Sequence, residues 1–185
     1  MRQLIRKSPS RLAGFWRDRR GVSAVEFALL APVLLLFYFG MAELTEAMMA
    51  QRRLNHVTSA VGDIVARDPV LTNAERNDVF AIGATLMAPF PSNTLTLCLV
   101  SITSNAQGRD TVAWVEPYQS PPDCPKAGDV LDIPVSVLPA GQSVIMSKAT
   151  YTYTTPVKYV SKDATTFRRT FYLRPRVSDA VTRTP

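Results

Sequence analysis

The chain has 185 residues and a formal net charge of +6, enough length for one domain plus an appendage. Seven of its 21 basic residues fall within the first 21 positions beside a single acid, Asp18, so the remaining chain is electrically neutral. The basic balance therefore gives no argument for a nucleic-acid-binding surface. A basic segment directly before an apolar one is instead typical of the cytoplasmic end of a membrane protein.

An apolar run covers residues 22–42 and contains one charged residue, Glu26. About 20 residues, at ~1.5 Å of rise each, cross a hydrocarbon core of ~30 Å. The run is apolar on all sides, unlike a soluble surface helix, and membrane helices tolerate a proline such as Pro32. We therefore expect a single-pass protein of a bacterial inner membrane. Residues 1–21 form a cytoplasmic leader, residues 22–42 span the membrane, and the C-terminus is periplasmic.

Helical spacing continues beyond the expected span. Between residues 47 and 64, apolar residues recur every three or four positions in one narrow stripe, with Glu43 and Glu46 outside it. The stripe consists of Ala47, Ala50, Leu54, Val57, Val61 and Ile64. The pattern ends at Asp68-Pro69, because proline disfavours helical backbone at the preceding residue. Residues 43–67 are thus expected to extend the helix into the periplasm, and residues 68–185 to form a periplasmic α+β domain.

The rest of the chain predicts one more helix and a small antiparallel sheet. Residues 72–75 match a capping box, and two prolines near residue 90 end the helix that follows. Alternating patterns predict about four strands, at residues 95–103, 111–116, 143–154 and 167–173. Residues 133–138 fit either a single helical turn or an extended piece, and the tail after Pro175 is expected to fray. The predicted fold class is α+β, with the long N-terminal helix packed on a one-sided sheet.

Cys98 and Cys124 are the two cysteines of the chain, and both follow the apolar run. In an oxidising periplasm they can form one disulfide, which would stabilise a small domain by roughly 3 kcal/mol. Two buried free thiols are the alternative interpretation. The compartment favours the disulfide.

The junction between the basic leader and the apolar run carries the most specific pattern. Gly21 ends the basic segment, Glu26 follows five residues later, and Phe27 comes next. A secretory signal peptide would have its cleavage site after the apolar region instead. The arrangement resembles the cleavage motif of type IV prepilins, especially those of the tight-adherence (Tad, Flp) pilus.

The similarity extends along the apolar run. Residues 25–36 and Gly40 look like the signature of TadE-like proteins, the pseudopilins of that system, and weaker similarities occur at residues 141–145, 151–156 and 173–176. This resemblance implies a pilin-like fold and cleavage between Gly21 and Val22 by a membrane prepilin peptidase. Cleavage would create an ammonium on Val22. Glu26, which precedes Phe27 in the motif, can pair with the ammonium of its own subunit or of a neighbouring one. The implied partners are the inner membrane, the peptidase, other Tad/Flp pilins and the pilus assembly platform.

These features predict a structural protein, not an enzyme: a TadE-like minor pilin acting in pilus assembly or initiation and in surface adherence. The chain is longer than the small major Flp pilins, which disfavours that role. Three alternatives are an unprocessed bitopic assembly factor of the same system, a secreted binding protein cut after Ala42, and a membrane-tethered enzyme. The enzyme has the least support, because His56 is the only histidine and no catalytic, metal-binding or cofactor motif is recognised.

Overall fold

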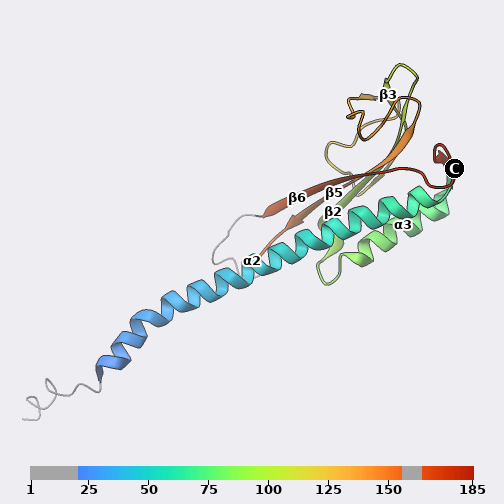
Figure 1. Cartoon of the computed structure of the whole chain (residues 1–185). Coiled ribbons are helices and arrows are strands. Elements are labelled where there is room, and N and C mark those ends of the chain that lie inside the picture. The colour runs from blue at the N-terminus through green and yellow to red at the C-terminus, as the bar shows by residue number, and fades with distance from the viewer. Residues whose placement is uncertain (1–20, 156–163) are drawn as a thin grey trace, which may run out of the picture. The chain divides into compact units, whose positions relative to one another are not determined.

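The computed structural model describes residues 21–155 and 164–185 and has an α+β fold (Figure 1). Its helices are α2 (Val22–Arg67), α3 (Asn73–Leu86) and the 3₁₀ helix η2 (Ser92–Thr94). The main sheet is antiparallel, in the order β4-β3-β2-β5-β6. Its strands are β2 (Leu95–Ser104), β3 (Asp110–Tyr118), β4 (Val130–Leu131), β5 (Ser143–Tyr153) and β6 (Thr165–Leu173). The predicted class is confirmed, with five strands in this sheet instead of about four.

The chain divides into two compact units, Met1–Ala42 and Glu43–Pro185, and α2 contributes residues to both. Helix α2 ends at Arg67, immediately before Asp68-Pro69, as predicted. Helix α3 begins after Thr72, whose side chain accepts a hydrogen bond from the Glu75 backbone N–H while the Glu75 carboxylate accepts one from the Thr72 backbone. The hydrogen bonds from the backbone and side chain of Thr72 lower the pKa of Glu75. The predicted capping box is therefore formed.

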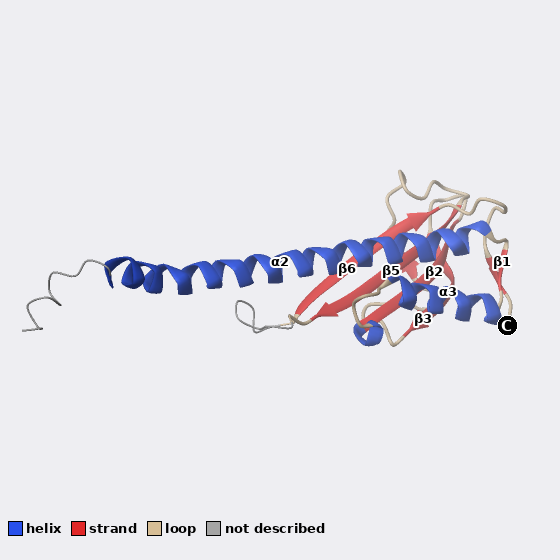
Figure 2. Ribbon diagram, turned by 90° about the horizontal axis from the view of Figure 1, so that it is seen from below, coloured by secondary structure: helices blue, strands red, loops and turns tan. Residues whose placement is uncertain are grey.

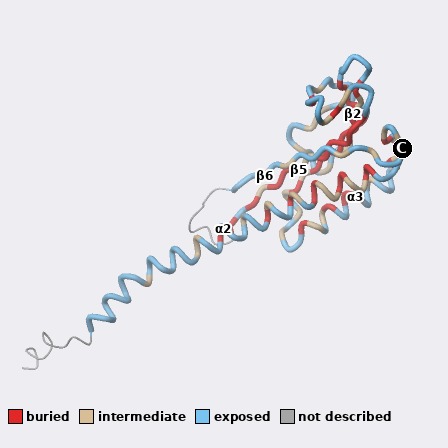
Figure 3. Tube along the Cα trace, viewed as in Figure 1, coloured by how far each residue is buried: buried red, intermediate tan, exposed pale blue. Residues whose placement is uncertain are grey.

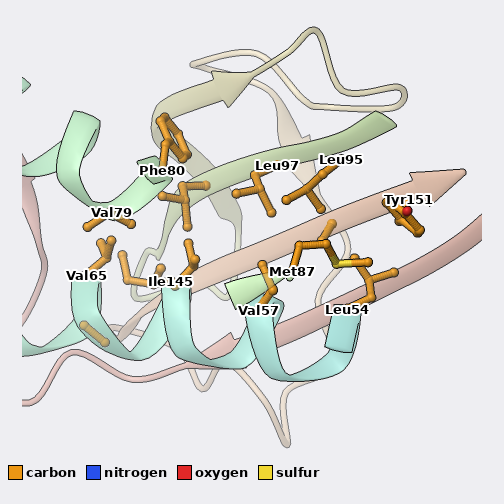
Figure 4. Close-up of a cluster of buried hydrophobic side chains, with 14 of the residues drawn as sticks. Leu54, Val57, Val65, Val79, Phe80, Met87, Leu95, Leu97, Ile145 and Tyr151 are labelled. Carbon is orange, nitrogen blue, oxygen red and sulfur yellow. The ribbon is translucent and has the colours of Figure 1, made fainter. Parts of the chain in front are cut away.

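The apolar stripe of α2 builds the larger of two hydrophobic clusters. Helix α3 lies beside the C-terminal part of α2, and both cover the same face of the sheet (Figures 1 and 2). Leu54, Val57 and Val65 of α2 meet Leu97 of β2 and Ile145 of β5 there (Figure 4). All of the predicted stripe is in this cluster, with Ala47 and Ile64 partly buried at its margin. The prediction that this segment buries its stripe on the sheet is confirmed.

Two glycines set the spacing between these layers. A Cβ on Gly62 of α2 would come 2.5 Å from Leu173 Cδ1 and 3.0 Å from Ser147 Cβ. A Cβ on Gly83 of α3 would come 3.0 Å from both Leu97 Cδ1 and Val61 Cγ2. The absence of a side chain at each position therefore permits close packing of α2 on the sheet and of α3 on α2.

The opposite face of the sheet is partly covered too, so the prediction of a one-sided sheet is wrong. A second cluster joins Cys98, Val100 and Ile102 of β2 to Ile133 and Leu138 of the connection between β3 and β5. Residues 134–138 form a single helical turn, because the Val137 and Leu138 N–H groups both donate to the Pro134 carbonyl at 2.8 and 3.0 Å. Strand β4 belongs to the same connection. It has two residues, too few to show a strand period in the sequence.

The C-terminal tail is bound to the domain, so the expectation that it frays is also wrong. Strand β7 (Thr182–Arg183) pairs in parallel with β1 (Val70–Leu71). The Trp114 indole N–H donates to the Val181 carbonyl at 2.7 Å, and Val181 is buried. Arg183 forms an ion pair with Glu116 at 2.6 Å. A two-residue strand, one apolar side chain and one ion pair hold the end of the chain, and none of them produces a local sequence pattern.

Candidate functional site

The predicted cleavage site lies at the N-terminal end of α2. Gly21 is the first residue that the structure describes, and Val22 is the first residue of the helix. No heavy atom lies within 4 Å of a Cβ built on Gly21, and its backbone is not in the left-handed region. The described fold therefore places no steric demand for glycine there. The basic leader, residues 1–20, lies outside the described residues.

The side chains that follow Gly21 are accessible. Val22 is 52% exposed, Phe27 is 67% exposed, and Glu26 is exposed as well. Val22 and Glu26 are four residues apart on one helix, so they lie on the same side of α2. Within residues 21–155 and 164–185, no ion pair to Glu26 is formed. This geometry leaves the Glu26 carboxylate available to an ammonium at Val22 or on another molecule.

The apolar run between Val22 and Ala42 is exposed along its length (Figure 3). Among the residues that the structure describes, α2 is the one helix long and apolar enough to cross a membrane, judged by length and composition. None of its most apolar window is buried by the protein itself. A helix with apolar side chains on all sides needs an apolar environment, and a lipid bilayer supplies one.

A carboxylate pair just beyond this run escaped the sequence analysis. Glu43 was placed outside the buried stripe, but it is only 6% exposed, on the side of α2 that the domain covers. The Tyr153 hydroxyl donates to Glu46 Oε2 at 3.1 Å. Burial, this hydrogen bond and the negative charges of Glu46 and Glu43 raise the pKa of Tyr153 to about 12. The burial of Glu43 could have been predicted from its spacing, because one side of the helix carries Glu43, Glu46, Ala47 and Ala50.

Cys98 and Cys124 are joined in a disulfide, with their Cα atoms 5.9 Å apart. Cys98 is fully buried in β2, and Cys124 lies in the connection that covers the second face of the sheet. The Lys148 ammonium donates to the neighbouring Asp123 carbonyl at 2.9 Å. The bond fixes the covering connection to the central strand, 26 residues away in sequence. The predicted pairing is therefore present in the structure.

In the described ranges, no three His, Cys, Asp or Glu side chains are grouped so that they could hold a metal ion. The single histidine, His56, is exposed on α2. The features that distinguish this chain are thus the accessible start of α2, its uncovered apolar surface and the disulfide-linked domain.

Comparison with known proteins gives one match. Residues 21–63 match the family model described as TadE-like protein. The match begins at Gly21 and includes Glu26, Phe27, the apolar run and most of the extension of α2. It confirms the TadE-like resemblance of the N-terminal segment and does not include the weaker similarities after residue 140. No curated protein and no solved structure matches the chain.

Proposed function

Because residues 21–63 are TadE-like, we propose that the chain is a minor pilin, or pseudopilin, of a Tad/Flp type IV pilus. The family match supports association with the Tad pilus system. We further propose that the chain is made as an inner-membrane precursor, cut after Gly21, and used to assemble or initiate the pilus and to support surface adherence. Its role is structural and not enzymatic.

One observation carries the proposal. Gly21, Val22, Glu26 and Phe27 lie within the family match and are accessible at the start of α2. A peptidase acting at the membrane face needs access to the backbone, which glycine favours because it has no side chain. The fold gives no steric reason for glycine at position 21. We therefore interpret Gly21 as a residue that the peptidase requires.

Glu26 has a separate role in the proposal. An isolated carboxylate in hydrocarbon is costly, and a nearby ammonium offsets that cost. Cleavage after Gly21 creates an ammonium one helical turn from Glu26. In a filament, the ammonium of a neighbouring subunit can take that place and set the axial register. Prepilin peptidase, other Tad/Flp pilins and the assembly platform are the partners that this role requires.

The mature N-terminus tests the proposal directly. Intact mass and N-terminal sequencing of the protein from cells with a Tad system should give a chain beginning at Val22. A chain beginning at Met1 would support the unprocessed assembly factor instead, and one beginning at Glu43 would support the secreted binding protein. Gly21→Leu should retain the leader, whereas Gly21→Ala is the control for a small substitution in open space.

The Glu26 role and the topology need their own measurements. Glu26→Ala should still insert in the membrane but reduce the number of surface pili, and normal piliation would exclude the pairing role. A reporter fused after Pro185 should be active only if it functions in the periplasm, because seven basic residues precede the span. Activity of a cytoplasmic reporter at that position would reverse the proposed orientation.

A further inference from the structure

Apolar side chains on the outer side of α2 remain exposed beyond the proposed span. Leu44, Met48 and Met49 are 56%, 51% and 45% exposed. At 3.6 residues per turn, Met48 lies about 160° around the helix from the buried Ala50, and Leu44 lies about 120° from it. We call Leu44, Met48 and Met49 the outer face. An apolar surface of this kind on a helix needs a partner or a lipid environment.

The charged residues of this segment are distributed unevenly around the helix. Glu43 is buried on the domain side, and Glu46 accepts the hydrogen bond from Tyr153. Arg52 and Arg53, one turn beyond Met48 and Met49, are exposed. The outer side of the helix therefore carries no charge from Leu44 to Met49 apart from the hydrogen-bonded Glu46, and Arg52 and Arg53 follow it. Such an order is typical of a helix leaving a bilayer, where basic side chains reach the lipid phosphates.

We propose that the outer face lies in the periplasmic interfacial layer of the bilayer, with Arg52 and Arg53 at the lipid phosphates. The inference rests on the membrane span of the proposed function. The 28 helical residues from Val22 to Met49 measure about 42 Å, which matches the ~40–45 Å of a bilayer with its headgroup layers. Lipid is the occupant because the outer face follows the span without a break on one helix and ends at arginines.

Site-directed fluorescence of the full-length chain tests this placement. Met48→Cys is labelled with an environment-sensitive fluorophore in vesicles of phosphatidylethanolamine and phosphatidylglycerol. Leu34→Cys is the control inside the span, and His56→Cys is the control two turns beyond Met48 on the outer side. All three positions are exposed, so the label displaces no packed side chain. Labelling is done without reductant, and the unsubstituted chain controls for reaction at Cys98 and Cys124.

We expect the Met48 label to be blue-shifted relative to the His56 label, protected from an aqueous quencher, and quenched most by nitroxide lipids labelled near the headgroup. Aqueous accessibility equal to that of the His56 label, with the Leu34 label still protected, would overturn the inference and leave the span intact. Protection without quenching by any nitroxide lipid would also overturn it, because a protein neighbour would then cover the outer face. An accessible Leu34 label would overturn the span and the inference together.

Discussion

The two parts of α2 on either side of Ala42 have opposite relations to their apolar side chains. Before Ala42, leucine and phenylalanine side chains point out on every side and stay exposed. After it, the apolar residues of one stripe are buried under a sheet, while the outer face ends in arginines. The same helix thus shows two patterns that α-helices use, one for lipid and one for a protein core. Composition separates these two parts, because residues 22–42 hold one charged residue and residues 43–67 hold six, and the angular distribution of the apolar residues shows which side of the second part packs on the sheet.

Two leucines test this contrast most strongly. Leu54→Ala removes a fully buried side chain from the core, and the cavity should lower the free energy of unfolding of the domain by about 4 kcal/mol. Leu34→Ala changes a residue that is 60% exposed in the apolar run and should alter the same quantity by less than about 0.5 kcal/mol. Urea titration of the full-length protein in detergent, with Trp16→Phe as background and Trp114 fluorescence as the signal, measures both. Equal losses would contradict the division of α2 into a lipid part and a core part.

The disulfide should distinguish the two parts as well. Reduction of Cys98–Cys124 frees the connection over the second face of the sheet, and should destabilise the domain by about 3 kcal/mol. The helical circular-dichroism signal of residues 22–42 in detergent should persist, because that segment does not depend on the bond. Alkylation without reductant should find no free thiol. Full labelling of both cysteines in protein purified from cells would show that the bond does not form there.

A pair of glycines gives a smaller effect with a matched control. Gly62→Ala places a methyl group 2.5 Å from Leu173 Cδ1 and 3.0 Å from Ser147 Cβ, so the Leu173 side chain must move out of its packed position, and stability should fall by about 1 kcal/mol. Gly21→Ala meets nothing within 4 Å and should leave the unfolding curve of the domain unchanged. The same titration compares them. If Gly62→Ala were neutral, α2 would not pack as closely on the sheet as described.

The last expected effect depends on pH. Tyr153 has a pKa of about 12 in the folded protein, against about 10 for an unperturbed tyrosine. Since the folded state favours the protonated phenol, this stabilisation is complete below pH 10 and is lost as the pH rises from 10 through 12. Stability should therefore fall by about 1 kcal/mol more in this interval for the wild type than for Tyr153→Phe. Burial raises the pKa of Tyr151 as well, and the charge of Tyr151 adds to the rise at Tyr153. If the stability of the wild type and of Tyr153→Phe changed with pH in parallel, Tyr153 would not contribute to this pH dependence.

Local chemistry explains which elements could be predicted from the sequence. Helix α2 ends where a proline follows, α3 starts at a side-chain cap, and β2 alternates in period two, so each is encoded by neighbouring residues. Strand β3 runs two residues beyond its predicted end at 116 because Pro117 and Tyr118 still pair with β2. The disulfide could also be predicted from the compartment, and the pattern at Gly21 and Glu26 lies within the segment that matches the family model.

The features that escaped prediction depend on residues far apart in sequence. Glu43 is buried because the domain folds over that side of α2, and its polarity alone argued for exposure. The tail is held through Trp114 and Glu116, which lie 67 residues before their partners. The covered second face of the sheet depends on the disulfide and the connection it holds. The hydrophobic periodicity of a single segment cannot predict such contacts, because they form only once the strands have assembled.

The pairing of β1 with β7 has a consequence for biogenesis. Residues 70–71 are synthesised early, but their partner, residues 182–183, follows 112 residues later. The apolar stripe of α2 is likewise covered only once β5 and β6 are present, since Ile145, Tyr151 and Leu173 belong to the same cluster. Folding of the domain therefore cannot be completed before residues 182–183 have been made. If the domain is exported, as proposed, the apolar stripe of α2 stays uncovered until its partner strands arrive, and such exposed apolar surface is prone to aggregation.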